Sequence, residues 1–431
     1  MRRGTLRTPA WTLAAFGLAI AGCFVGACGS SEDPNSINNG PGPDDPNDPN
    51  NPANQEKTPE EQIKQILDSR KTDYGEALRT ASLKLTDHLP TMEQIKQIEG
   101  AGDKKAAYEK LVDEMIASPD FARMMVKYWK DTFRIGFQGT RPDEQDPPQA
   151  LPQNVDRDAA PVFAAQLIVE NKSYMDLFTA NANTCPRFDR TAGTFTPGNC
   201  ALPTAAQQGQ QAQQGPTVGI ITDPGLLQQY YANMAFRRVR FLQETFVCNK
   251  FPAETQTGVP MGNGTYTGTM PFESITGKNN KADARVDFQD TKAVICANCH
   301  INLNKVAPLF MMYDMNGALR TTPQVRIPIP NEPVVARIDF LPDAEGYMWR
   351  KDKPVPDLAA LGAAMAADPD VARCAVNRVW NYAMSRGDIV ADQASVPNAV
   401  TDPYVQSFSS TGFKLKEVIR AVFKSEDFTK F

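Results

Sequence analysis

The stretch Met115-Ile-Ala-Ser-Pro-Asp-Phe-Ala-Arg123 predicts the end of one helix and the start of another. Residues 105–117 carry apolar side chains at the spacing of one helix face. Ser118 can accept hydrogen bonds from exposed amides of the next helix, Pro119 suits its first position and Asp120 complements its dipole. The stretch therefore predicts two consecutive helices joined by a sharp turn.

Two later stretches repeat this pattern. Met365-Ala-Ala-Asp-Pro-Asp-Val-Ala-Arg373 copies it closely, and Val422-Phe-Lys-Ser-Glu-Asp-Phe428 copies it more faintly. The recurrence fits either a degenerate internal repeat or the common way to write a helix, a cap and a helix. Residues 91–94 add a capping-box pattern. Most of the chain therefore reads as α-helix.

Strand signals are confined to one place. The runs QVRIPIP (324–330) and PVVARIDF (333–340) alternate as short strands do, and their prolines favour an edge position. We expect a mainly α protein of two helical domains with a small β-hairpin.

The composition excludes some classes of function. The 431 residues carry a formal net charge of -5 with 22% charged residues, and basic residues are mixed with acidic ones, so we expect no nucleic-acid partner. Histidine occurs only at positions 88 and 300, which removes multi-histidine metal sites. No G-x-S-x-G motif or recognisable acidic pair promotes a hydrolase.

The first residues predict export. A positive start is followed by an apolar run at 11–22 that is long enough for a signal peptide and short for a membrane span. Cys23 and Cys28 each end a sequence resembling a bacterial lipobox, and the choice between them stays open, as does an ordinary cleaved signal. We expect a lipid anchor on the outer membrane or the periplasmic face of a Gram-negative bacterium.

Composition divides the rest of the chain. We expect a signal peptide at 1–27, a Pro/Asn/Asp-rich tether at 28–58, a helical domain at 59–202, a Gln/Ala/Gly linker at 203–216 and a second helical domain at 217–431. In the first domain, Cys185 and Cys200 close a polar loop. An oxidising compartment favours a structural disulfide between them.

The five residues Cys296-Ala-Asn-Cys299-His300 form a C-x-x-C-H motif, the attachment signal of c-type haem. In that chemistry the two thiols add to the vinyl groups and the imidazole becomes the proximal iron ligand. A zinc site would need two further ligands, and a thioredoxin-like pair would need a βαβ setting that is missing. A plain disulfide between Cys296 and Cys299 is the remaining alternative.

The chain resembles planctomycete and myxobacterial cytochrome-c-like families of unknown function. The resemblance rests on the C-x-x-C-H motif followed by an apolar stretch and Tyr313-Asp-Met-Asn-Gly317, on the lead-in at 219–248 and on closing helices near 368–387 and 415–428. Residues 85–135 are similar to a companion helical domain. Lys305 departs from the pattern, because a proline often stands there, and the insertion that begins at Cys185 has no counterpart.

The resemblance implies an exported c-type cytochrome-like protein with one haem c and no stated substrate. Cys248 and Cys374 fall where these families also tend to carry cysteine, which implies a disulfide, with two separate buried thiols as the alternative.

Methionine sulfur is the natural second axial ligand where histidine is scarce. Met348 is our candidate; Met270 and His88 are others, Met311, Met312 and Met315 fit packing beside the macrocycle, and Met384 fits the core. Arg237, Arg238 and Arg240 form a basic cluster that can pair with haem propionates or be a solvated helix face.

We therefore expect a lipid-anchored monohaem protein that transfers electrons, as a subunit or partner of an extracytoplasmic oxidoreductase, rather than a catalyst of its own. The alternative is a non-catalytic surface lipoprotein in which Cys296 and Cys299 are joined. The sequence identifies neither the redox partner nor the reduction potential.

Overall fold

The computed structural model shows a mainly α-helical protein, as the sequence predicts. It describes residues 65, 68–135, 156–198, 200, 215–231, 235–251, 294–314, 317–319, 346–350 and 352–431, together with short strands between 260 and 339. Residues Arg70–Phe431 form one compact unit. The lipidation candidates Cys23 and Cys28, the signal peptide and the tether lie outside the described residues.

The first helices of the compact unit begin where the sequence places caps. Thr91 forms a capping box with Gln94, and the hydroxyl of Ser118 accepts a hydrogen bond from the N–H of Phe121. Apolar faces of these helices meet in one core, in which Tyr108, Phe121 and Trp129 are buried. The helices are α2 (Tyr74–Thr86), α3 (Met92–Glu99), α4 (Lys104–Ile116), α5 (Pro119–Thr132), α6 (Ala159–Val169) and α7 (Asp176–Thr179).

The central helices form a second part of the same core. The short helix α8 (Pro224–Gln229) begins at Asp223, whose side chain accepts a hydrogen bond from the N–H of Leu226. Helix α9 (Phe236–Phe246) packs against α10 (Val294–Phe310). Helix α10 contains Pro308 near its end.

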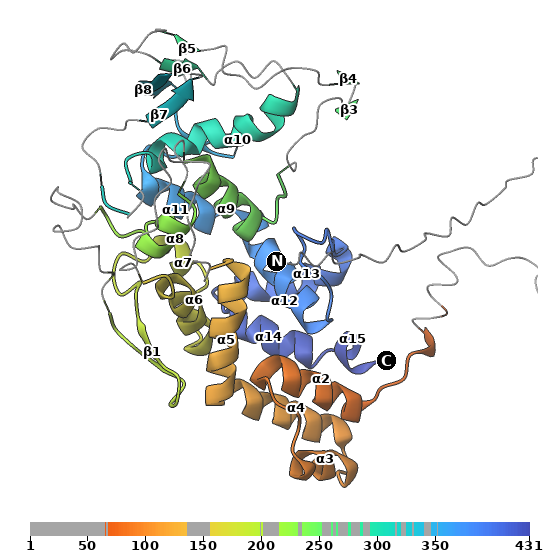
Figure 1. The fold of residues 1–431 in the computed structure, drawn as a ribbon. Helices are drawn as coiled ribbons and strands as arrows, with labels where there is room; N and C mark the ends of the chain where they lie inside the picture. Colours follow the sequence, from red (N-terminus) through yellow and green to blue (C-terminus); the bar gives the residue numbers. More distant parts are fainter. Residues whose placement is uncertain are drawn as a thin grey trace, which may run out of the picture. The chain divides into compact units, whose positions relative to one another are not determined.

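The last helices return to the first. Asp368 caps α12, and Ser425 caps α15, so all three echoing stretches hold an N-cap between two helices. Figure 1 shows α14 and α15 beside α2 and α4, and these helices are in contact. The helices are α11 (Leu358–Ala366), α12 (Pro369–Ala383), α13 (Asn398–Ser410), α14 (Leu415–Phe423) and α15 (Glu426–Thr429).

The predicted hairpin is confirmed. Strand β7 (Val325–Ile329) pairs antiparallel with β8 (Glu332–Asp339), with Ile327 opposite Val334. Two further strands of this sheet were not predicted. Strand β8 also runs parallel to β6 (Arg285–Asp287), and β6 pairs antiparallel with β5 (Ile275–Thr276). The strand order is β5-β6-β8-β7. The remaining pairs are β1 (Arg187–Asp189) with β2 (Thr194–Thr196), β3 (Pro260–Met261) with β4 (Gly264–Thr265), and β9 (Met348–Trp349) with β10 (Lys353–Pro354).

The two ends of the compact unit are joined by main-chain hydrogen bonds. The N–H of Lys71 donates to the carbonyl of Phe431 at 2.9 Å, the N–H of Phe431 donates back at 3.0 Å, and the N–H of Asp73 donates to Thr429 at 3.0 Å. The hydroxyl of Tyr108 donates to the carbonyl of Phe423 at 2.7 Å. Helices from the start and the end of the chain therefore share one core.

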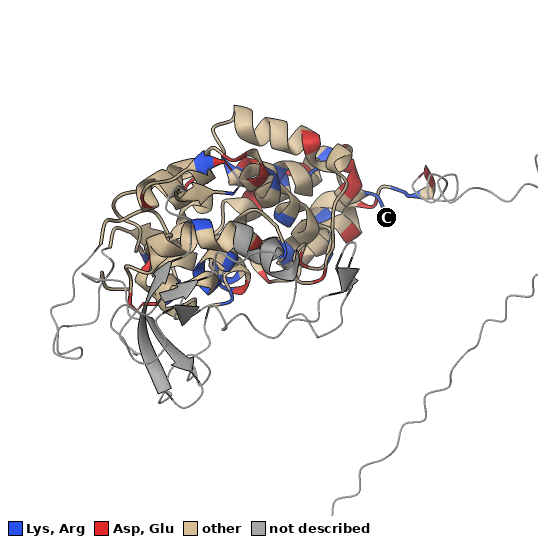
Figure 2. Cartoon of the chain, turned by 90° about the horizontal axis from the view of Figure 1, so that it is seen from above, with Lys and Arg blue, Asp and Glu red and all other residues tan. Residues whose placement is uncertain are grey.

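The sequence predicts a domain boundary at 203–216, and most of this segment lies outside the described residues. Helices from both sides of it, such as α6 and α14 or α6 and α8, are in contact within the compact unit. Figure 2 shows basic and acidic residues interspersed along the described helices. Within the described ranges, none of the helices combines the length and apolar character needed to span a membrane.

Candidate functional site

The C-x-x-C-H motif lies in the first turns of α10. Positions 296, 299 and 300 are separated by three and four residues, so helical backbone places all three on one side of α10. The side chains of residues up to 301 lie outside the described residues. From residue 302 onward, α10 is held by the elements packed around it.

The described half of α10 is anchored by apolar packing. Leu303, Val306, Ala307 and Phe310 are buried, and the helix contacts both α9 and β9. Burial of aliphatic and aromatic side chains of this size stabilises a contact by about 1.5 to 3 kcal/mol each. The segment that follows the motif is therefore a fixed core element.

Arg238 holds the C-terminal end of α10. Its side chain is buried, and its five N–H groups donate to carbonyl oxygens: Nη1 to Phe310 and Tyr313 at 2.9 and 3.0 Å, Nη2 to Leu227 and Asp314 at 2.7 and 2.8 Å, and Nε to Leu227 at 3.1 Å. This guanidinium satisfies carbonyls that a helix end leaves without an intrahelical donor. The sequence predicts either a propionate-binding cluster or a solvated helix face, whereas Arg238 is buried and its N–H groups donate to backbone carbonyl oxygens.

The other two arginines of the predicted cluster face elsewhere. Arg240 forms an ion pair with Glu244 at 2.9 Å, the i,i+4 arrangement of a solvated helix face. Arg237 and Arg240 both line a cavity of about 410 Å³ between α5, α9 and α12. Arg237 and Arg240 thus lie on a different side of α9 from Arg238.

The Tyr-Asp-x-x-Gly segment is a tight turn after α10. The N–H of Ala318 donates to the Asp314 carboxylate at 3.0 Å, and the N–H of Asp314 donates to the Ala318 carbonyl at 2.9 Å. Gly317 has φ +76°, and a Cβ there would lie 2.8 Å from Cα of Pro224. The glycine therefore permits both the turn and the close approach of α8.

Met348 lies beside α10. It is half-buried on β9, and its sulfur is 4.0 Å from Nζ of Lys305, a residue of α10. The structure therefore brings the distal-ligand candidate to the helix that carries the motif.

Strand β9 is fixed by the residues next to Met348. The indole N–H of Trp349 donates to Asp368 at 2.8 Å, and Arg350 forms ion pairs with Asp368 at 3.2 Å and with Asp370. Asp368 is itself the N-cap of α12, and Arg350 adopts φ +56°. One buried carboxylate therefore joins β9 to α12.

Both predicted disulfides are present: Cys185 with Cys200, and Cys248 with Cys374. The second bond ties the end of α9 to α12, on either side of α10 in the chain. His88 is 68% exposed and lies 3.4 Å from Asp120, a surface ion-pair position. Met311 is buried, and Met312 and Met384 pack on the core, whereas Met270 and Met315 lie outside the described residues.

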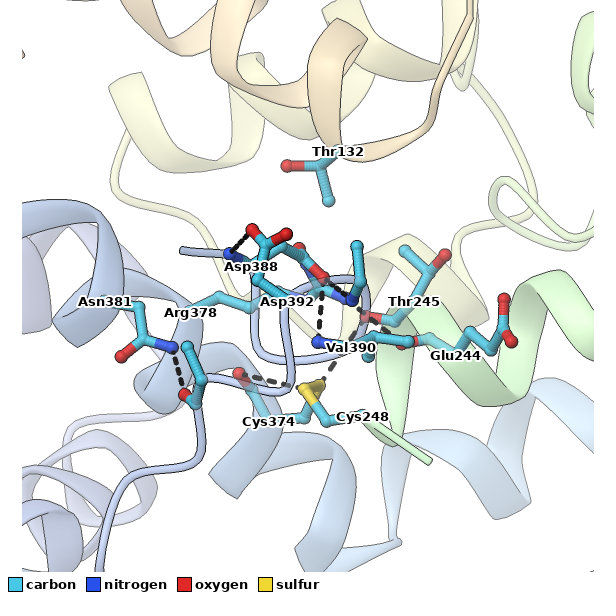
Figure 3. A network of polar contacts seen from close by, with 12 residues as sticks. Thr132, Glu244, Thr245, Cys248, Cys374, Arg378, Asn381, Asp388, Val390 and Asp392 are labelled. Carbon is cyan, nitrogen blue, oxygen red and sulfur yellow. Dashed lines mark hydrogen bonds and ion pairs between the residues drawn. A yellow bond between two sulfur atoms is a disulfide. The ribbon is translucent and has the colours of Figure 1, made fainter. Parts of the chain in front are cut away.

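The sequence did not single out Arg378, which lies on α12 one turn after Cys374 of the second disulfide (Figure 3). Its Nη1 donates to Asp388 at 2.5 Å and its Nη2 to the carbonyl of Glu244 at 3.1 Å. Burial alone would raise the pKa of Asp388, but Arg378 and the N–H groups of Ala391 and Val390 hold it below its ordinary value. No local signal marks Arg378, because its partners lie 10 and 134 residues away.

The comparisons concern the first helices. Residues 57–156 match a family model described as PSCyt2, a protein of unknown function (DUF1549), which is a planctomycete cytochrome-c-like family. The match covers α2 to α5 and ends before the C-x-x-C-H motif. No curated protein and no solved structure matches the chain. The N-terminal helices are thus similar to those of a cytochrome-c-like family.

Proposed function

We propose that the chain is an exported, lipid-anchored monohaem c-type cytochrome-like protein in electron transfer. The observation that carries this proposal is the helical placement of positions 296, 299 and 300 on one side of α10, whose remaining length is fixed in the core. The similarity of residues 57–156 to a cytochrome-c-like family adds support.

In this proposal Cys296 and Cys299 hold haem c by thioether bonds and His300 is the proximal iron ligand. The haem supplies one-electron transfer at its iron. The chain contributes α10, whose C-terminal end is fixed by the hydrogen bonds of Arg238 and by apolar packing. A redox partner protein outside the cytoplasm takes or gives the electron.

The first test is the intact mass of the full chain produced in a host that attaches haem c. The two disulfides of the structure remove four hydrogens from the mature chain. We expect that mass plus one covalently bound haem, and a reduced-minus-oxidised spectrum typical of thioether-bonded haem.

The alternative proposal, a non-catalytic surface lipoprotein with Cys296 joined to Cys299, predicts a different mass. No haem would be bound, and six hydrogens rather than four would be missing. The Cys296→Ala and Cys299→Ala variants should each lose a thioether bond, whereas a control with Cys185 and Cys200 both changed to Ser should keep the haem. A colourless wild-type protein would refute the haem proposal.

We propose Met348 as the second axial ligand, on the support of its position on a fixed strand beside α10. Replacing Met348 with Ala should remove the near-infrared charge-transfer band of a methionine–iron bond and lower the reduction potential. Met312→Ala, which changes a methionine packed on the core, is the matched control. An unchanged band in Met348→Ala would exclude this ligand.

A further inference from the structure

The sulfur atoms of Cys185 and Cys200 share their surroundings with a buried carboxylate. Both sulfurs and an oxygen of Asp223 lie within 4.8 Å of one another, and Oδ2 of Asp223 is 3.6 Å from Sγ of Cys185. Asp223 is 1% exposed. Burial makes the charged form of a carboxylate costly, so this group favours the protonated state.

The two sulfur atoms differ in access. Cys185 is buried, whereas Cys200 is half-buried, and the hydroxyl of Thr184 lies 3.5 Å from the Cys200 sulfur. An attacking thiolate therefore reaches Cys200 first, and Cys185 becomes the leaving group. A thiolate left at Cys185 would be buried, and a proton supplied there would remove that cost.

We propose that Cys185–Cys200 is a redox-active disulfide that exchanges with an extracytoplasmic dithiol, with Asp223 as the proton donor to Cys185. This inference does not require the haem, but its extracytoplasmic dithiol rests on the proposed export of the chain. It assigns a reaction to a bond that the sequence presents only as a loop closure.

The exchange conserves atoms and electrons. A thiolate of the dithiol attacks Sγ of Cys200, the Cys185–Cys200 bond breaks, and the carboxylic acid of Asp223 gives its proton to the Cys185 thiolate. The second thiol of the dithiol then displaces Cys200, so the dithiol becomes a disulfide. Cys185 and Cys200 gain two electrons and two protons in total, and solvent returns the proton to Asp223.

The burial of Asp223 supports the role of donor near neutral pH. Burial raises the pKa of Asp223 to about 7, the N–H groups of Leu226 and Gly225 oppose this rise, and the neighbouring carboxylate of Asp156 adds to it. A donor with this pKa is partly protonated at the pH at which thiols begin to ionise.

The second disulfide of the chain is the internal control. The sulfur of Cys248 lies 3.7 Å from the carbonyl oxygen of Cys374, and the sulfur of Cys374 lies 3.6 Å from that of Thr245. Carbonyl oxygens cannot donate a proton. Cys248–Cys374 should therefore exchange slowly in the folded protein.

The test uses the full folded chain with dithiothreitol, followed by acid quench, alkylation and peptide mass mapping. We expect Cys185–Cys200 to be reduced at least 100-fold faster than Cys248–Cys374 at pH 7. Asp223→Asn should slow reduction of Cys185–Cys200 at least tenfold, while Asp189→Asn, an amide replacement within the same loop, should leave the rate unchanged.

Each outcome of this experiment decides the matter. Far-ultraviolet circular dichroism and the slow reduction of Cys248–Cys374 show whether Asp223→Asn stays folded, and in the folded variant a faster or unchanged rate would refute the proposal; Asp223→Glu, which keeps a carboxylic acid, should retain more of the wild-type rate if the proposal holds. Equal rates for the two disulfides in the wild-type chain would refute it as well. A rate that Asp189→Asn lowers as much as Asp223→Asn would assign the effect to the loop rather than to the proton donor.

Discussion

At the scale of single residues, the structure gives several polar side chains a buried role. Arg238, Asp223 and Asp368 all lie within the core, and Arg238 and Asp368 are each hydrogen-bonded to groups from more than one segment. Buried polar groups of this kind are costly when a partner is removed. They are therefore the residues at which single substitutions should act most strongly.

Replacing Arg238 with Ala removes five hydrogen bonds to four carbonyl oxygens, of which that of Phe310 keeps the N–H of Tyr313 as a donor. We expect the free energy of unfolding to fall by about 3 kcal/mol or more, measured by urea unfolding of the full chain. Arg240→Ala on the same helix removes a half-exposed ion pair and should cost at most about 1 kcal/mol. Equal losses for the two variants would contradict the buried role of Arg238.

Asp223 should make stability depend on pH. Its pKa is raised by burial to about 7 from an ordinary value near 3.8. The contribution of Asp223 to the free energy of unfolding is complete below the unfolded-state pKa and is lost as pH rises toward 7, because the unfolded chain releases the proton first. Between these two pKa values, the free energy of unfolding should fall by about 1.4 kcal/mol per pH unit. Urea unfolding of the wild-type chain and of Asp223→Asn between pH 4.5 and 6.5 measures the difference between their free energies of unfolding, and this difference should be independent of pH if Asp223 does not titrate in this range.

At the scale of elements, the sequence predicts those helix starts and strands that are determined by residues next to one another in the chain. Ser118 with Pro119 and Asp368 with Pro369 mark helix starts at their own positions, and the alternation at 324–340 marks the hairpin. The pairing of β8 with β6 could not be predicted, since the partners lie about 50 residues apart and neither run carries a signal for the other. The hydrogen bonds of Arg238 also depend on the packing of α10 against α9. Local sequence does not show this packing, so the arginines at 237, 238 and 240 are equally typical of a solvated helix face.

The N-caps offer a prediction at this scale. Asp368 caps α12 and also accepts from Trp349 and Arg350, whereas Asp357 caps α11 at an exposed position. Asp357→Ala should therefore cost about 1 kcal/mol, as a cap alone does, and Asp368→Ala should cost about 3 kcal/mol. Urea unfolding checks both values, and equal costs would show that Asp368 is only a cap.

At the scale of the whole molecule, long-range links join the start and the end of the compact unit. The main chain near Lys71 pairs with that near Phe431, and Phe428 beside it in the chain is buried. Lys424 and Arg420 of the last helices form ion pairs with Asp113 of α4 at 2.7 and 3.0 Å. The fold is thus completed by contacts that are more than 300 residues apart in sequence.

The disulfide Cys248–Cys374 is a covalent long-range link, because its two cysteines are 126 residues apart in the sequence. In the chain-entropy model a loop of this length stabilises the folded state by about 4 to 5 kcal/mol, against about 3 kcal/mol for Cys185–Cys200. We expect the double variant with Ser at 248 and 374 to lose more thermal stability than the one with Ser at 185 and 200, measured by calorimetry. The reverse order would show that the longer loop is already restricted before folding.

The bond between Cys248 and Cys374 also decides what happens to a chain that is cut once. Any single cut by a foreign protease between these two cysteines would yield two fragments that stay covalently linked, because the cut falls inside a closed ring of chain. The damaged copy would run at full size on a gel until a reducing agent is added. A nicked molecule would therefore keep both fragments together until its disulfide is reduced.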